Sequence, residues 1–287
     1  MQALNLLKQS LSFCVDRQLI KIVELALSED IGSGDLSSSL LDNVIINAEI
    51  VCRDRAIICG TEYFDLCFLS LDQSIQIKWN LKDGDEVQPG EIICNIEGKS
   101  RAIITAERTA LNFLQILSGT STKTNYLVNL ISETKAQLLD TRKTIPGLRK
   151  AQKYAVKCGG GVNHRMGLYD CIMLKENHIL SIGSLDKSIN KALKKYPDKS
   201  IVVEVETMEQ LHSVLKIKGI TRVLCDNFSL IDLREAVKIA QGIYPIEASG
   251  GVNEANIVSY AETGVDYISI GSVTKDVAAI DLSLRFS

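Results

Sequence analysis

The chain has 287 residues, of which 46% are hydrophobic and 23% are charged, and its formal net charge is -3. This length is enough for one large α/β barrel, or for a barrel with a smaller companion domain. The charge balance is typical of a soluble globular protein and excludes a global basic field that would attract nucleic acid.

Cysteine spacing and the N-terminal segment predict where the protein resides. None of the eight cysteines are spaced as CxxC, and several lie inside apolar runs such as residues 56–59. Free thiols in a reducing cytosol explain this better than disulfides or a metal site. Residues 1–13 lack a continuous apolar core and a cleavage site, and no run approaches the ~20 apolar residues of a membrane span. The sequence therefore predicts a cytoplasmic protein with no membrane partner.

In chain order, the first part of the sequence predicts an α/β domain with an antiparallel sheet. Residues 18–29 place their apolar side chains on one helical face. A helix is also expected near residues 61–70, and the helical pattern resumes from Glu107 to about Ile131. The short apolar runs bounded by Gly and Asp turns that predict strands are residues 45–52, 56–59, 75–79 and 92–96.

The second part alternates strands with helices. Its near-continuous apolar runs predict a parallel sheet, and they are residues 136–139, 171–174, 201–203, 222–225, 244–246 and 267–270. Because only six such strands can be found, the sequence predicts an incomplete β/α barrel.

Each of these strands has, at or directly after its end, a residue that is able to do chemistry. They are Asp140, Lys175, Glu204, Asp226, Glu247, and finally Ser269, which leads to Gly271. A single such residue would be explained by a helix cap or a solvated strand end. For six consecutive strands we favour a shared site, because the loops after barrel strands converge on one face.

Residues 141–175 are locally very basic. They contain eight Lys or Arg residues and His164, against the single acid Asp170. Most of the cations between 149 and 157 are best explained as the solvated face of a helix. Arg142 and Lys143, however, directly follow a strand, and Arg165 follows a glycine-rich loop that allows close approach of the backbone to a ligand. These three cations suit an anionic substrate.

Two glycine turns late in the chain predict phosphate sites. Ser249-Gly-Gly251 and Gly271-Ser272 are each expected to open onto a helix, where backbone N–H groups bind phosphate. Together with Glu204, Asp226 and Glu247, they fit a phosphorylated sugar pyrophosphate with Mg²⁺. From the residues alone, the prediction is glycosyl transfer from such a donor to an acidic acceptor. Two alternatives remain open, namely a Schiff-base enzyme that uses Lys175 and a non-catalytic barrel that binds a phosphorylated ligand.

Several longer motifs resemble the quinolinate phosphoribosyltransferase family, also called carboxylating nicotinate-nucleotide pyrophosphorylases. The most specific are DTRKTIPGLR at 140–149, KYAV at 153–156, GGGVNHR at 159–165 and LKENH at 174–178. Further matches in the same order are EDIGSGD at 29–35, ERTALN at 107–112, EVE at 204–206, DN at 226–227, EASGG at 247–251 and GVDYIS at 264–269. The resemblance therefore spans nearly the whole chain.

The resemblance implies a fold and a reaction. The fold is an N-terminal open-faced α/β sandwich domain at 1–112, an incomplete six-stranded barrel with the active site at 113–273, and a tail at 274–287 that packs back on the first domain. The reaction, which belongs to NAD biosynthesis, converts quinolinate and phosphoribosyl pyrophosphate to nicotinate mononucleotide, pyrophosphate and CO₂, with Mg²⁺ bound to the donor. A paralogue that acts on another heteroaromatic acid remains an alternative.

The resemblance also implies residue roles and a homodimer with shared sites. The residues expected to bind substrate are Arg108 lent by the partner subunit, Thr141, Arg142, Lys143, His164, Arg165, Lys175, Glu204, Asp226, Glu247, Ser249, Gly250, Gly251, Gly271, Ser272 and Val273. Quinolinate would lie among Arg142, His164, Arg165 and Lys175. Lys143 would face the pyrophosphate donor, Glu204 and Asp226 the ribose, and the glycine turns its 5-phosphate.

Among these residues, the catalytic ones would be Lys143, Lys175, Glu204 and Asp226. The metal ligands stay open at this point, with Glu204 and Asp226 as candidates for indirect contact. One position departs from the family pattern, because this chain has Lys275 where members often have His.

Overall fold

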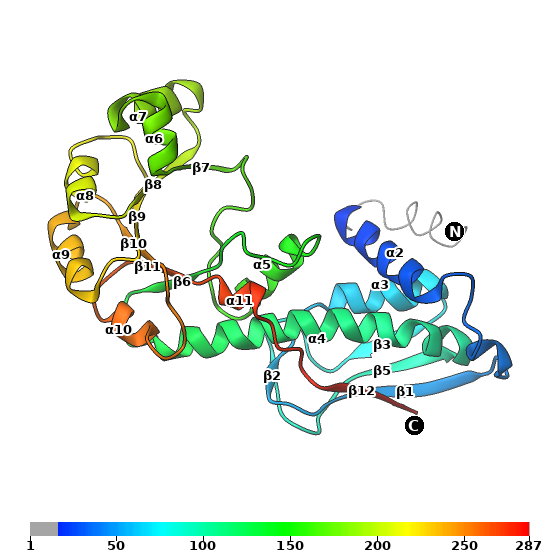
Figure 1. Cartoon of the computed structure of the whole chain (residues 1–287). Coiled ribbons are helices and arrows are strands. Elements are labelled where there is room, and N and C mark those ends of the chain that lie inside the picture. Colours follow the sequence, from blue (N-terminus) through cyan, green and yellow to red (C-terminus); the bar gives the residue numbers. More distant parts are fainter. Residues whose placement is uncertain (1–16, 287) are drawn as a thin grey trace. The chain divides into compact units, whose positions relative to one another are not determined.

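The computed structural model describes residues 17–286, which form two compact units (Figure 1). One unit comprises the chain up to Thr122 together with the segment from Val277 onward, and the other is Lys123–Asp276. The sequence predicts the corresponding boundaries at 112 and 273. Cys14 and the N-terminal segment considered for targeting lie outside the described residues.

The four-stranded sheet of the first unit is antiparallel throughout. In spatial order its strands are β12 (Leu282–Phe286), β1 (Ile45–Cys52), β5 (Ile92–Lys99) and β3 (Gln76–Trp79). Two short strands, β2 (Ala56–Ile57) and β4 (Glu86–Val87), form a separate antiparallel pair. The predicted antiparallel sheet is confirmed, and the C-terminal strand β12 adds an edge to it.

The helical elements that begin in the first unit are α2 (Arg17–Ile31), η1 (Ser38–Leu40), α3 (Thr61–Leu71) and α4 (Ser100–Leu130). The prediction that the last of these begins at Glu107 was wrong, because α4 begins at Ser100. Ile103 and Ala106 are fully buried and continue the apolar face of Ala110 towards the N-terminus of the helix. The apolar pattern therefore extends one and a half to two turns further back than predicted.

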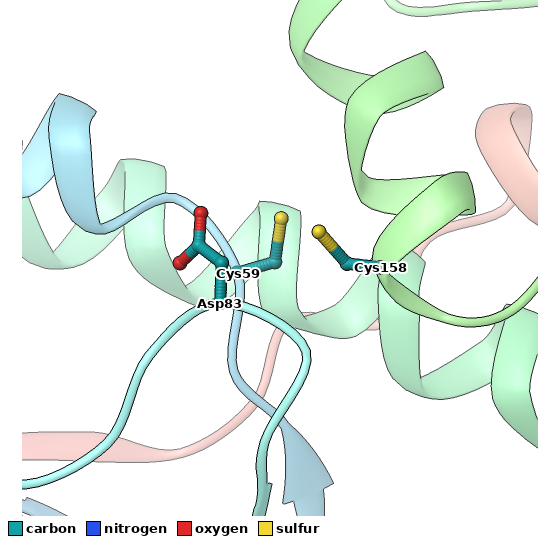
Figure 2. Close-up of side chains that lie close together, drawn as sticks. All are labelled: Cys59, Asp83 and Cys158. Atoms are coloured by element: carbon teal, nitrogen blue, oxygen red, sulfur yellow. The ribbon is translucent and has the colours of Figure 1, made fainter.

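The start of α3 is stabilised by a carboxylate from another loop. Asp83 Oδ1 accepts hydrogen bonds from the backbone N–H groups of Gly60 and Thr61, at 3.0 and 3.1 Å. Figure 2 shows this carboxylate beside Cys59; Cys158, also labelled there, ends α5 in the second unit. Asp83 satisfies N–H groups that have no acceptor within the helix, and so acts as an N-terminal cap.

The second unit contains a parallel sheet of six strands with the spatial order β6-β11-β10-β9-β8-β7 (Figure 1). Their bounds are β6 (Gln137–Leu139), β7 (Cys171–Leu174), β8 (Ser200–Val205), β9 (Arg222–Asp226), β10 (Ile246–Ser249) and β11 (Tyr267–Ser269). The strands β6 and β7, consecutive along the chain, lie at opposite edges of the sheet. The predicted incomplete six-stranded barrel is therefore confirmed.

Helices follow the strands of the second unit, and α8 and α9 cover one face of the sheet (Figure 1). The helices are α5 (Arg149–Cys158), α6 (Glu176–Ile182), α7 (Leu185–Lys195), α8 (Met208–Val214), α9 (Leu230–Ala240), α10 (Ile257–Ala261) and α11 (Ser272–Lys275). Three of them begin at a hydroxyl cap, because Ser184, Thr207 and Ser229 accept from the N–H three residues later. Apolar side chains fill the space between strands and helices.

One strand of this sheet lies later in the chain than predicted. The sequence predicts a strand at residues 244–246, with Glu247 at its end, whereas β10 is Ile246–Ser249 and contains Glu247. Pro245 has no backbone N–H to give to a ladder, so the strand begins after it. Glu247 is consequently inside the sheet and not at its carboxyl end.

None of the seven cysteines in residues 17–286 forms a disulfide. Burial raises the pKa of Cys225 to about 12, and it also raises the pKa values of Cys67 and Cys94. These thiols are therefore kept protonated at neutral pH. No helix within residues 17–286 has the length and apolarity needed to cross a membrane.

Candidate active site

Asp140, which follows β6, is fully buried and anchors the glycine-rich loop. Its carboxylate accepts from the backbone N–H of His164 at 2.8 Å and from Asn163 Nδ2 at 2.6 Å, and it is paired with Lys153 Nζ. Lys153 is only 1% exposed and also donates to the carbonyl of His164 at 3.0 Å. Lys153 is therefore an exception to the solvated face that was predicted for most cations of this helix, whereas Lys150 and Lys157 are exposed. Asp140 and Lys153 together fix the segment that carries His164.

Gly161 of this loop is required by close packing against α4 and α5. A Cβ on Gly161 would lie 2.8 Å from Val156 Cγ1 and 2.9 Å from Thr124 Cγ2. The loop also pairs with the edge strand β6, since the N–H of Val162 donates to the carbonyl of Leu138 at 2.8 Å. The loop is therefore a tightly packed element that gives Arg165 a defined position.

Arg142 and Arg165 bring two guanidinium groups near each other. Arg165 is partly buried, and the contacts of its guanidinium are the carbonyl of Cys171 at 3.5 Å and Met173 Sδ at 3.6 Å. Burial is the largest cause that lowers the pKa of Arg165, and the positive charge of Arg142 is the second largest. The negative charge of a bound anion would offset both effects, so this part of the site is suited to a carboxylate or phosphate ligand.

His164 is held by groups on both sides of its ring. Nδ1 accepts from the backbone N–H of Arg165 at 2.7 Å, and Nε2 lies 3.4 Å from Glu247 Oε1. Glu247 is itself 0% exposed, and Arg222 Nε lies 2.7 Å from its other oxygen. Burial by itself would raise the pKa of Glu247, but His164 and then Arg222 keep it below its usual value. Glu247, predicted to bind substrate, is thus placed to orient His164.

A cation and a carboxylate from neighbouring strands meet at the carboxyl ends of β7 and β8. Lys175 Nζ lies 2.8 Å from Glu204 Oε1 and 2.5 Å from Oε2. The Lys175 side chain is 46% exposed and that of Glu204 is 12% exposed. The pair therefore sits at the surface of the unit, where a ligand can reach the ammonium group.

Glu204 of this pair also belongs to a group of three carboxylates. One oxygen from each of Glu204, Glu206 and Asp226 lies within 4.8 Å of the others. Oxygen donors of this kind suit Mg²⁺, which is held by one or two carboxylates and by the phosphates of a substrate. Glu204 and Asp226 were predicted as possible metal ligands. Glu206 was not, although it lies two residues after Glu204, just beyond the end of β8 at Val205.

The two glycine turns have different surroundings. Gly250 has a φ of 96°, and a Cβ there would lie 2.1 Å from Asn227 Oδ1, so only glycine fits. The prediction that this turn opens directly onto a helix was wrong, because α10 begins at Ile257. Gly271 does cap α11, and a Cβ on it would lie 2.8 Å from Lys143 Cδ. The aliphatic stem of Lys143 therefore packs on the Gly271 backbone.

The remaining predicted residues are placed as follows. Thr141 Oγ1 accepts from the N–H of Lys143 at 3.0 Å and shapes the loop after β6. Val273 is fully buried in the hydrophobic core of the second unit, so its side chain does not face a ligand. Lys275 is exposed and its ammonium lies 2.8 Å from Asp276 Oδ2. Arg108 is exposed on α4 in the first unit, whereas the other predicted site residues belong to the second unit.

Sequence profiles of two family domains match the chain. The C-terminal domain of quinolinate phosphoribosyl transferase matches residues 120–285, and the N-terminal domain of the same family matches residues 35–118. Together the two matches cover most of the chain and agree with the presence of two units.

Individual relatives match over nearly their full length. The chain is 39% identical to a probable carboxylating nicotinate-nucleotide pyrophosphorylase of Bacillus subtilis (strain 168), over 93% of each chain. It is 35% identical to the decarboxylating quinolinate phosphoribosyltransferase 1b of Nicotiana tabacum, over 92% of this chain and 81% of that one. The solved nicotinate-nucleotide pyrophosphorylase of Francisella tularensis superposes with a TM-score of 0.93 at 45% identity, covering 96% and 98% of the two chains. This chain therefore belongs to the quinolinate phosphoribosyltransferase family.

Proposed function

We propose that this chain joins quinolinate to phosphoribosyl pyrophosphate and decarboxylates the adduct, which yields nicotinate mononucleotide, pyrophosphate and CO₂. The observation that carries the proposal is the arrangement within the second unit. The positive charges of Arg142 and Arg165 interact with each other, and the Lys175–Glu204 pair lies next to Asp226. Cations for an acidic acceptor and carboxylates for a ribosyl cation are thus presented side by side.

In this reaction the pyridine nitrogen attacks the anomeric carbon of the ribose, and the bond to pyrophosphate breaks. The resulting pyridinium then accepts the electron pair left by loss of CO₂ from the adjacent carbon, which finally takes up a proton. Arg142, His164, Arg165 and Lys175 surround the quinolinate carboxylates. Since no covalent enzyme intermediate is required, catalysis rests on orientation and charge placement.

Three groups of residues bind the donor, phosphoribosyl pyrophosphate. Lys143 faces the pyrophosphate, while Glu204 and Asp226 lie along the ribose and stabilise positive charge that develops at its anomeric carbon. The 5-phosphate lies against the glycine turns. The residues of these turns are Ser249, Gly250, Gly251, Gly271, Ser272 and Val273.

The contacts of Lys175 do not favour the alternative of a Schiff-base enzyme. Both oxygens of Glu204 are within 2.8 Å of its ammonium group. That arrangement suits a charged group, whereas a Schiff-base nucleophile reacts as a neutral amine.

The proposed acceptor is tested by comparing quinolinate with nicotinate. Nicotinate lacks the carboxylate next to the ring nitrogen, so one set of site cations stays unpaired when it binds. We expect its kcat/KM to be lower by about 10³-fold or more, because a site built for a polar group strongly rejects the analogue without it. Release of pyrophosphate from the purified protein with each acceptor measures this. Comparable turnover of both acceptors would contradict the proposal.

We also propose that Mg²⁺ accompanies the donor and lies near Glu204, Glu206 and Asp226. The fit rests on the donor set, because these carboxylates provide oxygen atoms within 4.8 Å of one another. When bound, the ion would neutralise negative charge on the departing pyrophosphate.

Replacing Glu206 tests the metal proposal. Glu206→Gln is expected to raise the Mg²⁺ concentration for half-maximal activity by about tenfold, since it removes one charge near the ion while Glu204 and Asp226 remain. Titration of Mg²⁺ at saturating substrates measures the effect. Glu209→Gln, an exposed acid in the first turn of α8, is the control and should leave the titration unchanged. Identical curves for both variants would place the ion elsewhere.

The remaining parts of the proposal concern assembly and location. We propose a homodimer in which Arg108 of each subunit completes the active site of the other. A cytoplasmic enzyme is supported by cysteines that, within residues 17–286, form no disulfide.

A further inference from the structure

Two fully buried polar side chains connect three segments of the second unit. Gln152 lies in α5, and its Nε2 donates to the carbonyl of Thr274 in α11 at 2.8 Å. Its Oε1 accepts from the backbone N–H of Ile145, in the loop after β6, at 2.8 Å. Thr274 Oγ1 in turn donates to the carbonyl of Lys143 at 2.7 Å. The loop after β6 is therefore fixed to both helices.

Two of these hydrogen bonds satisfy backbone groups of the irregular loop after β6. Lys143 and Ile145 lie in the loop between β6 and α5, outside the backbone hydrogen-bond ladders of strands and helices. Both Gln152 and Thr274 are 0% exposed, so water does not compete for these bonds. A buried bond of this kind defines position, because breaking it leaves a polar group without a partner.

The side chain of Lys143 is constrained as well as its backbone. A Cβ on Gly271 would lie 2.8 Å from Lys143 Cδ and 3.5 Å from Thr141 Oγ1. The stem of Lys143 thus runs directly over Gly271, while the Thr274 hydroxyl holds its carbonyl. Both constraints come from the turn that begins α11, so the position of Lys143 depends on that turn.

We infer that Thr274 and Gln152 are positioning residues that hold Lys143 against the turn at Gly271, so that its ammonium group and the turn act on the same donor molecule. This inference rests on the proposed function. It assigns both residues to the phosphoribosyl pyrophosphate side of the site and not to the quinolinate side. Neither residue touches substrate, so each acts through Lys143 and α11.

The decisive variant is Thr274→Val, which removes the hydroxyl and nearly preserves the volume. Its kcat/KM for phosphoribosyl pyrophosphate should fall by about 10- to 100-fold, because small displacements of a positioning shell cost that much. The KM for quinolinate, at saturating donor, should stay within about twofold of the parent on the same reasoning. Thr274→Ser keeps the hydroxyl and should recover most of the lost activity.

Two further variants make the test specific. Gln152→Met removes the bonds to Ile145 and Thr274. Like Thr274→Val, it should lower kcat/KM for phosphoribosyl pyrophosphate while leaving the KM for quinolinate nearly unchanged. Thr263→Val is the matched control, because Thr263 is also buried in the second unit and donates to a backbone carbonyl, that of Tyr260, at 2.6 Å. It should lower the melting temperature to a similar extent while leaving both KM values unchanged.

Several results would overturn the inference. They are parental kinetics in Thr274→Val, equal changes for both substrates, or an equal kinetic loss in Thr263→Val. If Thr274→Val and Gln152→Met fail to fold while Thr263→Val folds, the bonds maintain the fold and do not specifically place Lys143. A parent protein with no turnover of quinolinate would instead contradict the proposed function, and the two failures are therefore distinguishable.

Discussion

Lys153→Met is expected to lower the free energy of unfolding by about 3–5 kcal/mol, the usual cost of removing one partner from a buried ion pair. Lys153 is 1% exposed, and its partner Asp140 is 0% exposed. Without the ammonium group, the Asp140 carboxylate keeps only its hydrogen bonds from His164 and Asn163. Urea unfolding followed by circular dichroism measures the change.

The loss in Lys153→Met should depend on pH. Burial already raises the pKa of Asp140 in the parent, and the positive charge of Lys153 opposes this rise. In the variant the charge of Lys153 is absent, so the pKa of Asp140 in the folded state lies above its value in the unfolded state. Such a group favours the folded state below the unfolded pKa and loses this contribution as pH rises through the folded pKa. The deficit should therefore be smaller at pH 5 than at pH 8.

Two controls separate the buried charge from the loss of a lysine. Lys157→Met changes an exposed residue in the last turn of the same helix and should cost no more than about 1 kcal/mol. Adding Asp140→Asn to Lys153→Met removes the buried charge while an amide oxygen can still accept from the N–H of His164. This double variant should recover part of the stability and lose the pH dependence. A deficit for Lys153→Met no larger than that of Lys157→Met would contradict the prediction.

Much of the fold followed from hydrophobic patterning in the sequence. Strand β7 occupies the predicted residues, and the order of strands and helices in the second unit is confirmed. The start of β10 was wrong, because one apolar run spans Tyr244 and Ile246 while Pro245 interrupts the ladder between them. Local pattern indicates where a strand can form, but a missing N–H decides where pairing begins.

Within the site, the sequence indicated which residue types are present better than which side chains they pair with. Lys153 occurs in a helix with four cations, and periodicity alone could not show that one of them is buried. Its burial depends on Asp140, which precedes it by thirteen residues and comes from another element. Arg222 was missed for the same reason, because it begins β9, far in the chain from the motifs, and reaches His164 only through Glu247. Such partnerships arise when strands are brought together.

Arg108 was the prediction with the least local support, since it lies on α4 and is exposed. If Arg108 completes the site of the partner subunit, Arg108→Ala and Lys143→Ala homodimers should each retain below about 1% of parental activity, because each lacks a group that positions substrate. Steady-state turnover of quinolinate with phosphoribosyl pyrophosphate measures this. Each homodimer has the same defect in both of its sites.

Co-refolding the two variants should restore activity. In a mixed dimer, one barrel has an intact Lys143 and receives an intact Arg108 from its partner, while the other barrel carries both defects. Random association gives about half mixed dimers with one working site each, so roughly a quarter of parental activity is expected. Mixing Lys143→Ala with Asp226→Asn is the control. Both of these residues belong to the second unit of the same chain, so every site in that mixture keeps one defect.

The control mixture should therefore stay inactive, although its mixed dimers form equally well. Recovery only in the mixture that contains Arg108→Ala would show that Arg108 and Lys143 of one site come from different subunits. No recovery in that mixture, with mixed dimers demonstrated by mass spectrometry, would place Arg108 in the site of its own subunit or outside any site.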